Sequence, residues 1–142
     1  MLPTMRMFSL FLMLPTLSTG LFLQPTKCDV DVGPQGSREP AVRDFDVPQE
    51  CSNGTFRWAY PQKTVHLRFL NQYKRQISVC IRNDMLGEIF TIRDITHSIG
   101  MPMIIGDKES CTMKYREDIT LRIDAPEILY YVGSILYQVY EE

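Results

Sequence analysis

The stretch CSNGTFRWAYPQKTVHLRFLNQYKRQISVCIR, residues 51–82, decides the fold of this chain. Within it, apolar side chains recur at every second position in three short runs. These residues are Phe56, Trp58 and Tyr60, then Val65, Leu67 and Phe69, and then Ile77, Val79 and Ile81. A period of two places successive side chains on opposite faces of a strand, so each run predicts a half-buried β-strand. The stretches 61–63 and 71–72, which contain proline and asparagine, predict the turns between the strands.

The alternation continues on the C-terminal side of this stretch. The residues that carry it are Phe90 and Ile92, then Met113 and Tyr115, and then Ile119, Leu121 and Ile123. The segment 128–140 is rich in Tyr, Ile and Val, and residues 94–99 allow one helical turn. Seven or eight short strands with turns at near-regular spacing predict an all-β, antiparallel β-sandwich.

The segment 29–50 precedes the first of these strands and is rich in Asp, Gly, Pro and Gln. Its prolines and glycines interrupt regular structure, so we predict a long loop. Most of its charges are typical of a solvated face. Asp44 and Asp46 leave a second interpretation open, because carboxylates two residues apart can share a calcium ion.

The first twenty residues predict a secretory signal peptide. An apolar run follows Arg6, and Pro15 and a stretch of mostly small residues close it. The run is too short to span a bilayer, which takes roughly 20 residues. The small residues favour cleavage after Gly20, which leaves residues 21–142 as a single domain. The alternative, a helix buried in the folded domain, fits poorly with Pro15.

The charge balance limits the classes of protein to which this chain can belong. The chain has 15 basic and 17 acidic side chains, a net charge of −2, and loss of Arg6 with the signal peptide makes this −3. A mildly acidic chain with mixed charges lacks the basic patch of a nucleic-acid-binding protein. No second apolar stretch is long enough to cross a membrane. We therefore expect a secreted, extracellular protein that binds no nucleic acid and does not span a membrane.

Four cysteines remain in the mature chain, Cys28, Cys51, Cys80 and Cys111. They are too far apart for the close pairs of zinc sites and redox motifs. An even number of separated cysteines in a secreted chain predicts two disulfides, and the sequence alone allows three pairings. Asn53-Gly54-Thr55 is a glycosylation sequon, which predicts a glycan on Asn53.

The sequence contains no catalytic motif that we can identify. It has no Gly-x-Ser-x-Gly elbow, His-Glu-x-x-His motif, phosphate-binding glycine loop or Cys/His metal cluster. His66 and His97 are expected at the surface. We therefore predict no enzymatic activity, no cofactor and no metal. Trp58 is expected in the core, and an aromatic platform for a ligand is the alternative.

Two segments are predicted to bind a partner. The loop 97–110 combines glycine and proline with apolar side chains, and the last strand carries tyrosines on both faces. The predicted contact residues are Met101, Met103, Ile104, Tyr137 and Tyr140. The alternative is that residues 103–105 form a short buried strand.

Several motifs of the chain occur in a fixed order. They are Cys51, Trp58-Ala59-Tyr60-Pro61, Leu67-Arg68, Val79-Cys80-Ile81-Arg82 and, later, Cys111. This ordered set resembles the N-terminal CUB-like domain of the meteorin and meteorin-like family, and the early Cys28 also fits. The resemblance implies a CUB-like β-sandwich of the jelly-roll type. It also implies the disulfides Cys28–Cys51 and Cys80–Cys111.

The same resemblance implies a function. Members of the meteorin family are secreted signalling proteins, hormone-like or neurotrophic, that act through cell-surface receptors. They continue into a cysteine-rich, netrin-like second domain, which we do not expect in this chain. The alternative function is a non-signalling extracellular module that binds matrix, carbohydrate or a protease.

Overall fold

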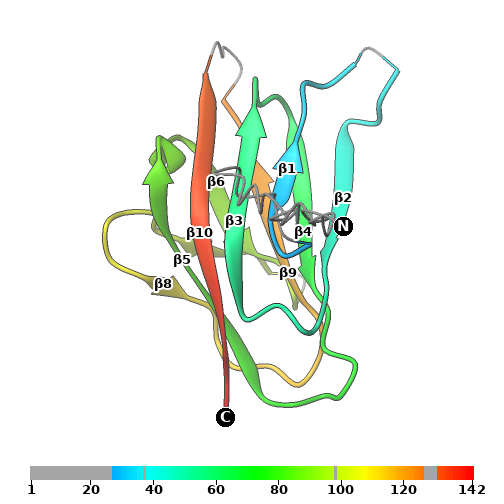
Figure 1. The fold of residues 1–142 in the computed structure, drawn as a ribbon, viewed down its shortest axis with the longest axis vertical. Helices are drawn as coiled ribbons and strands as arrows, with labels where there is room; N and C mark the ends of the chain where they lie inside the picture. The colour runs from blue at the N-terminus through cyan, green and yellow to red at the C-terminus, as the bar shows by residue number, and fades with distance from the viewer. Residues whose placement is uncertain (1–26, 37, 98, 127–130) are drawn as a thin grey trace, which may run out of the picture.

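The computed structural model describes residues 27–36, 38–97, 99–126 and 131–142. The predicted signal peptide over 1–20, with its cleavage site after Gly20, lies outside these ranges. The described chain forms a sandwich of two five-stranded β-sheets (Figure 1). The predicted all-β sandwich with two disulfides is therefore confirmed.

Sheet A has the strand order β1-β3-β10-β5-β8, and sheet B has the order β2-β4-β9-β6-β7. The strands of sheet A are β1 (Val30–Val32), β3 (Asn53–Ala59), β5 (Ile77–Met85), β8 (Ser110–Cys111) and β10 (Val132–Glu141). The strands of sheet B are β2 (Val42–Val47), β4 (Thr64–Phe69), β6 (Thr91–Asp94), β7 (Met101–Met103) and β9 (Ile119–Asp124). One 3-10 turn, η1 (Gly87–Ile89), follows β5. Among the residues that the structure describes, no helix has the length and apolar character to cross a membrane.

Two edge pairings depart from the predicted antiparallel arrangement. Strand β1 runs parallel to β3, and β2 runs parallel to β4. A parallel pair requires a long crossover connection. The chain supplies it by alternating between the sheets over its first four strands, so that β2 lies within one crossover and β3 within the other.

The predicted loop over 29–50 is wrong at two places, because β1 and β2 lie within it. In β1, Val30 and Val32 are buried on either side of an exposed aspartate. In β2, Asp44 and Asp46 occupy the outward positions of an edge strand. Three of the charges that we assigned to a solvated loop, Asp31, Asp44 and Asp46, are thus solvent-facing residues of two short strands.

Two other local predictions also differ from the structure. Met113 and Tyr115 form no strand, because β8 ends at Cys111 and Tyr115 makes only an isolated bridge. The described part of 94–99 forms a turn rather than a helical turn. Its backbone is held by the Asp94 carboxylate, which accepts a hydrogen bond from the Thr96 amide at 3.0 Å.

The hydrophobic core fills the space between the two sheets. Trp58 is fully buried there, stacked on Phe90 with ring centroids 5.7 Å apart and edge-on to Phe56 at 6.2 Å. The prediction that Trp58 belongs to the core is confirmed. Gly133 lies opposite Trp58, and a Cβ atom at this position would come within 2.5 Å of the Phe90 ring. Tyr60, predicted on the same strand face, follows the end of β3 and is exposed.

Both disulfides pair as the family resemblance implies. Cys28–Cys51 joins the start of the described chain to the segment before β3, with Cα atoms 5.4 Å apart. Cys80–Cys111 links directly opposite residues of β5 and β8. The second bond attaches the two-residue edge strand β8 to sheet A.

Candidate functional site

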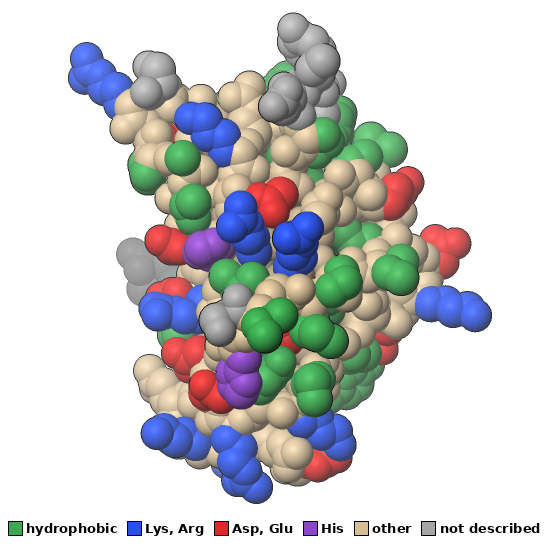
Figure 2. Space-filling model, turned by 180° about the vertical axis from the view of Figure 1, so that it is seen from behind, with side chains coloured by type: hydrophobic (Ala, Val, Ile, Leu, Met, Phe, Trp, Pro, Cys, Tyr) green, Lys and Arg blue, Asp and Glu red, His purple; other side chains and the backbone are tan. Residues whose placement is uncertain are grey.

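Exposed apolar side chains gather at the free edge of sheet B. Ile99 and Ile104 flank β7 and are 80% and 83% exposed, and Met101 within β7 is 52% exposed. We call Ile99, Met101, Pro102 and Ile104 the edge cluster. Figure 2 shows the face opposite to that of Figure 1, and hydrophobic side chains gather there beside Lys and Arg side chains. Met101 and Ile104 are therefore accessible, as the prediction of partner binding requires.

Strand β7 presents the edge cluster because only one of its sides is paired. It pairs with β6, so that Met103 lies opposite Ile92 and Pro102 lies opposite Arg93. Met103 is buried and fixes β7 to the core. Proline has no N–H to donate, so Pro102 hinders the addition of another strand. The edge cluster is thus suited to side-chain contacts with a partner rather than to pairing of backbones.

A hydrogen-bonded network supports the turn that leads into β7. Asp94 is buried and accepts hydrogen bonds from the Thr96 hydroxyl at 2.6 Å and the Tyr115 hydroxyl at 2.8 Å. The Thr96 hydroxyl in turn accepts the Thr120 amide of β9 at 3.2 Å. Burial, followed by the hydrogen bond to Asp94, raises the pKa of Tyr115 to about 12. The network therefore joins the end of β6 to β9 and to Tyr115, next to the strand that carries the edge cluster.

Two of the predicted contact residues are buried, so their prediction as contact residues is wrong. Tyr137 faces the core because the register of β10 places it opposite Gly54, and its hydroxyl donates to the Cys28 carbonyl. Burial, and to a lesser extent the Asp29 charge, raises the pKa of Tyr137 to about 12. Met103 faces the core from β7. The alternative of a buried segment over 103–105 holds for Met103 but not for the exposed Ile104.

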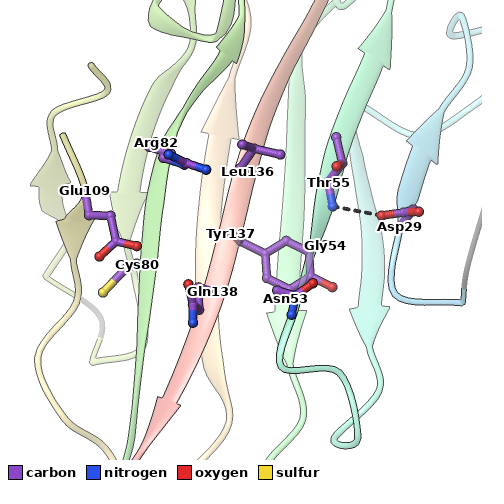
Figure 3. Close-up of a pocket in the computed structure, with 10 residues that line it drawn as sticks. All are labelled: Asp29, Asn53, Gly54, Thr55, Cys80, Arg82, Glu109, Leu136, Tyr137 and Gln138. Atoms are coloured by element: carbon purple, nitrogen blue, oxygen red, sulfur yellow. Dashed lines mark hydrogen bonds between the residues drawn. The ribbon is translucent and has the colours of Figure 1, made fainter. Parts of the chain in front are cut away.

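Tyr140 lies on the outer face of sheet A, near the C-terminal end of β10. Its hydroxyl donates to the Glu109 carboxylate at 3.0 Å, and the residue is 41% exposed. Next to it, the same face contains a groove of about 410 Å³ (Figure 3). Arg82, Gln138 and Glu109 contribute polar groups to the lining. Because most of its lining is polar, this groove is suited to hydrogen bonding rather than to apolar contact.

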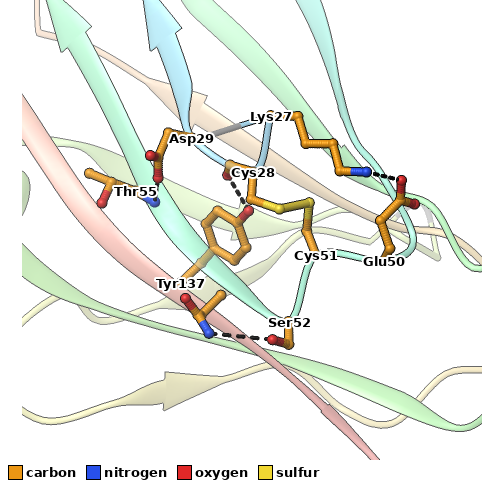
Figure 4. Close-up of a disulfide and its surroundings, with 9 residues drawn as sticks. Lys27, Cys28, Asp29, Glu50, Cys51, Ser52, Thr55 and Tyr137 are labelled. Atoms are coloured by element: carbon orange, nitrogen blue, oxygen red, sulfur yellow. Dashed lines mark hydrogen bonds and ion pairs between the residues drawn. A yellow bond between two sulfur atoms is a disulfide. The ribbon is translucent and has the colours of Figure 1, made fainter. Parts of the chain in front are cut away.

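The predicted glycosylation site lies at this groove. Asn53 begins β3, is exposed, and belongs to the groove lining together with Thr55. The neighbouring backbone is fixed by the Asp29 carboxylate, which accepts the Thr55 amide at 2.9 Å (Figure 4). The Cys28–Cys51 disulfide lies beside this contact (Figure 4). A glycan on Asn53 would extend over the outer face of sheet A.

The outer face of sheet B carries charged side chains in rows across its strands. His66 Nδ1 lies 3.3 Å from an Asp44 carboxylate oxygen, and Arg68 forms two hydrogen bonds with Asp46 at 2.9 and 3.0 Å. Asp44 and Asp46, the two carboxylates that could share a calcium ion, therefore each lie next to a basic side chain. Asp46 is thus in an ion pair with Arg68 and Asp44 is in contact with the His66 ring, an arrangement that does not favour a shared calcium ion.

The two histidines have carboxylate partners. His66 pairs with Asp44, and His97 Nε2 lies 2.5 Å from Glu117 Oε1. Neither ring is hydrogen-bonded to a hydroxyl or thiol within the described ranges, so neither forms the nucleophile–base pair of covalent catalysis. What these surfaces offer is apolar contact, ion pairing and hydrogen bonding.

Two basic residues of the same face were not predicted from the sequence. Arg93 of β6 and Arg122 of β9 lie directly opposite each other, next to the edge cluster. Each arginine occupies a polar position in a strand whose apolar and polar residues alternate. Such a position predicts only an ordinary solvated side chain. Only the register between the two strands brings them together.

No protein-family model matches the chain, and no curated protein gives a significant match. The resemblance to the meteorin family therefore stays a prediction.

Proposed function

We propose that the protein is a secreted, meteorin-like signalling ligand that binds a cell-surface receptor through the edge cluster. The observation that carries this proposal is the exposure of Ile99, Met101 and Ile104 at the free edge of sheet B. Contiguous exposed apolar side chains on a soluble domain are typical of sites for protein–protein interaction. Covering such side chains contributes roughly 1.5–3 kcal/mol each when burial is complete.

The extracellular location rests on the covalent and sequence features together. The chain contains two disulfides, and disulfides persist in oxidising compartments. The apolar run after Arg6 and the sequon at Asn53 agree with entry into the secretory pathway. Expressed in animal cells, the protein should appear in the medium with an N-terminus near Leu21. An Asn53→Gln variant should lose a glycosidase-sensitive shift in mobility.

A non-signalling carbohydrate- or matrix-binding module is the second candidate. The polar groove on sheet A supports it, because sugar hydroxyls pair with side chains such as Arg82, Glu109 and Gln138. A glycan on Asn53 at the margin of that groove would compete for the same space. Removing the glycan by Asn53→Gln should therefore increase carbohydrate binding if this second candidate is correct.

Cell binding tests the proposed function. Labelled protein is titrated on a panel of cell types, and bound label and receptor phosphorylation are measured. Ile104→Asp should abolish saturable binding while leaving secretion and the melting temperature unchanged, because Ile104 is exposed. Tyr73→Asp is the matched control, since Tyr73 is 75% exposed in the turn between β4 and β5, outside the edge cluster.

Three results would count against the proposal. Saturable binding that survives Ile104→Asp would show that the edge cluster is not the contact. Loss of secretion in Ile104→Asp would show that this side chain is required for folding. Adhesion without any phosphorylation response would favour the second candidate.

A further inference from the structure

A row of side chains crosses the outer face of sheet B and ends at the edge cluster. The registers place Asp44, His66, Arg122 and Arg93 opposite one another on β2, β4, β9 and β6. Directly opposite residues have Cβ atoms about 4.5–5.5 Å apart. Arg122 and Arg93 therefore stand as two adjacent cations, and Pro102 of the edge cluster is the next position in the row.

The charges within this row are unequally compensated. His66 has Asp44 as its partner, and Arg122 Nε donates to Asp124 Oδ2 at 3.0 Å. The Arg93 side chain makes no hydrogen bond or ion pair with any residue of the described ranges. Like charges directly opposite each other on a sheet destabilise the fold. The Arg93–Arg122 pair thus raises the free energy of the unbound protein and favours an anion between the two guanidinium groups.

The Arg93 side chain is held beside the apolar surface. Gly100 lies in the turn before β7, and a Cβ atom there would be 3.2 Å from Arg93 Cδ. The aliphatic part of Arg93 therefore packs closely against this turn, which carries Ile99 on one side and Met101 on the other. The guanidinium group is left at the boundary between the charged row and the edge cluster.

The surrounding carboxylates limit the kind of anion that fits. Asp44, Asp46 and Asp124 lie on the same outer face as the two arginines. A long polyanion such as a sulfated glycan would meet these carboxylates as well as the arginines. A single carboxylate is small enough to bind the arginine pair beside Asp124, which already accepts a hydrogen bond from Arg122 Nε. Arginine binds carboxylates with two parallel hydrogen bonds.

We propose that Arg93 and Arg122 bind one Asp or Glu carboxylate of a protein partner, whose apolar side chains cover the edge cluster. This inference rests on the proposed function and adds the chemistry of the partner: an acidic side chain adjoining an apolar surface. The carboxylate fixes the orientation of the partner, while the edge cluster supplies most of the buried apolar area.

A first experiment tests the arginine pair without a partner. The protein is labelled with nitrogen-15 at arginine, and its Nε–H resonances are followed during addition of sodium acetate. Sodium chloride at equal ionic strength is the control. The Arg93 and Arg122 resonances should shift together in acetate only. Arg57, an exposed arginine on the outer face of sheet A, should not respond. Equal shifts at all three arginines would overturn the proposal.

A second experiment uses the cells that bind the wild-type protein. Arg93→Glu should weaken binding by about tenfold or more and reduce its dependence on salt, because a carboxylate would then face a carboxylate. Arg57→Glu is the matched control, since it makes the same charge change on the opposite sheet. The melting temperature of Arg93→Glu should be unchanged or raised, because the substitution replaces like charges by opposite charges across β6 and β9.

The outcomes separate this inference from the proposed function. If Arg93→Glu binds like the wild type while Ile104→Asp does not, the carboxylate inference is wrong and the proposed function stands. If both variants bind normally, both proposals are wrong. If heparinase treatment of the cells abolishes binding, the ligand is a sulfated glycan, and the inference of a protein carboxylate is overturned.

Discussion

Replacing Gly54 by alanine tests the packing that anchors the N-terminal segment to sheet A. A Cβ atom on Gly54 would lie 2.5 Å from the Tyr137 hydroxyl and 2.7 Å from its ring, and closer still to the Cys28 carbonyl oxygen. Neither group can move freely, because Tyr137 is buried and Cys28 is held by a disulfide. The close approach of these groups is possible only without a side chain at this position.

The expected cost follows from the contacts that would be disturbed. Forcing a methyl group into a packed site costs about 1–3 kcal/mol. Displacing Tyr137 also breaks its hydrogen bond to Cys28, a net contribution of about 0.5–1.5 kcal/mol. The ring contact between Tyr137 and Phe69, with centroids 5.0 Å apart, weakens as well. Gly54→Ala should therefore lower the free energy of unfolding by about 2–4 kcal/mol.

Urea unfolding monitored by the fluorescence of Trp58, the single tryptophan, measures this effect. The substitution keeps the Asn-x-Thr sequon, so glycosylation is unaltered. Gly106→Ala is the control, because a Cβ atom at Gly106 meets nothing within 4 Å. In a Tyr137→Phe background, which removes the hydroxyl oxygen 2.5 Å from the added Cβ atom, Gly54→Ala should cost less. A Gly54→Ala variant as stable as Gly106→Ala would refute the reasoning.

Three further predictions concern the core, the disulfides and the tyrosines. Trp58 should show blue-shifted, poorly quenched fluorescence, and Trp58→Ala should cost about 3–5 kcal/mol; red-shifted emission would contradict its burial. Peptide mapping without reduction should recover Cys80 linked to Cys111, and Cys80→Ser should cost about 2–5 kcal/mol in unfolding experiments; another pairing would contradict the structure. Tyr115 and Tyr137 have pKa values raised to about 12, whereas unfolded tyrosines ionise near 10. The stability from these neutral phenols should be complete below about pH 10 and lost between about pH 10 and pH 12, which pH-dependent unfolding and tyrosinate absorbance will check.

The alternation within residues 51–82 was sufficient to predict the central strands and the burial of Trp58. Alternation is a local property, because successive side chains of any strand point to opposite faces. The segment 29–50 was predicted as a loop from its prolines and glycines, although buried and exposed residues also alternate in the two short strands that it contains. The two strands form because β1 pairs with β3 in one sheet and β2 pairs with β4 in the other. Both partner strands lie outside the segment, so its own residues do not reveal these pairings.

The face of the sheet on which a side chain lies also became known only from the tertiary structure. The tyrosine-rich last segment predicts that some tyrosines face outward, but a period of two does not say which. Tyr137 faces the core because Gly54 lies opposite it, and Tyr140 faces solvent near Glu109. The prediction of Tyr137 as a contact residue was wrong for this reason.

The sequence by itself determined that the chain has alternating strands, four cysteines in the right number for two disulfides, and an apolar stretch over 97–110. The tertiary structure decided that Met101 and Ile104 are exposed at a free edge and that Arg93 stands opposite Arg122. Alternation is encoded by neighbouring residues along the chain. Register is set by hydrogen bonds between strands far apart in sequence, so side chains on different strands become neighbours only when the sheets have formed.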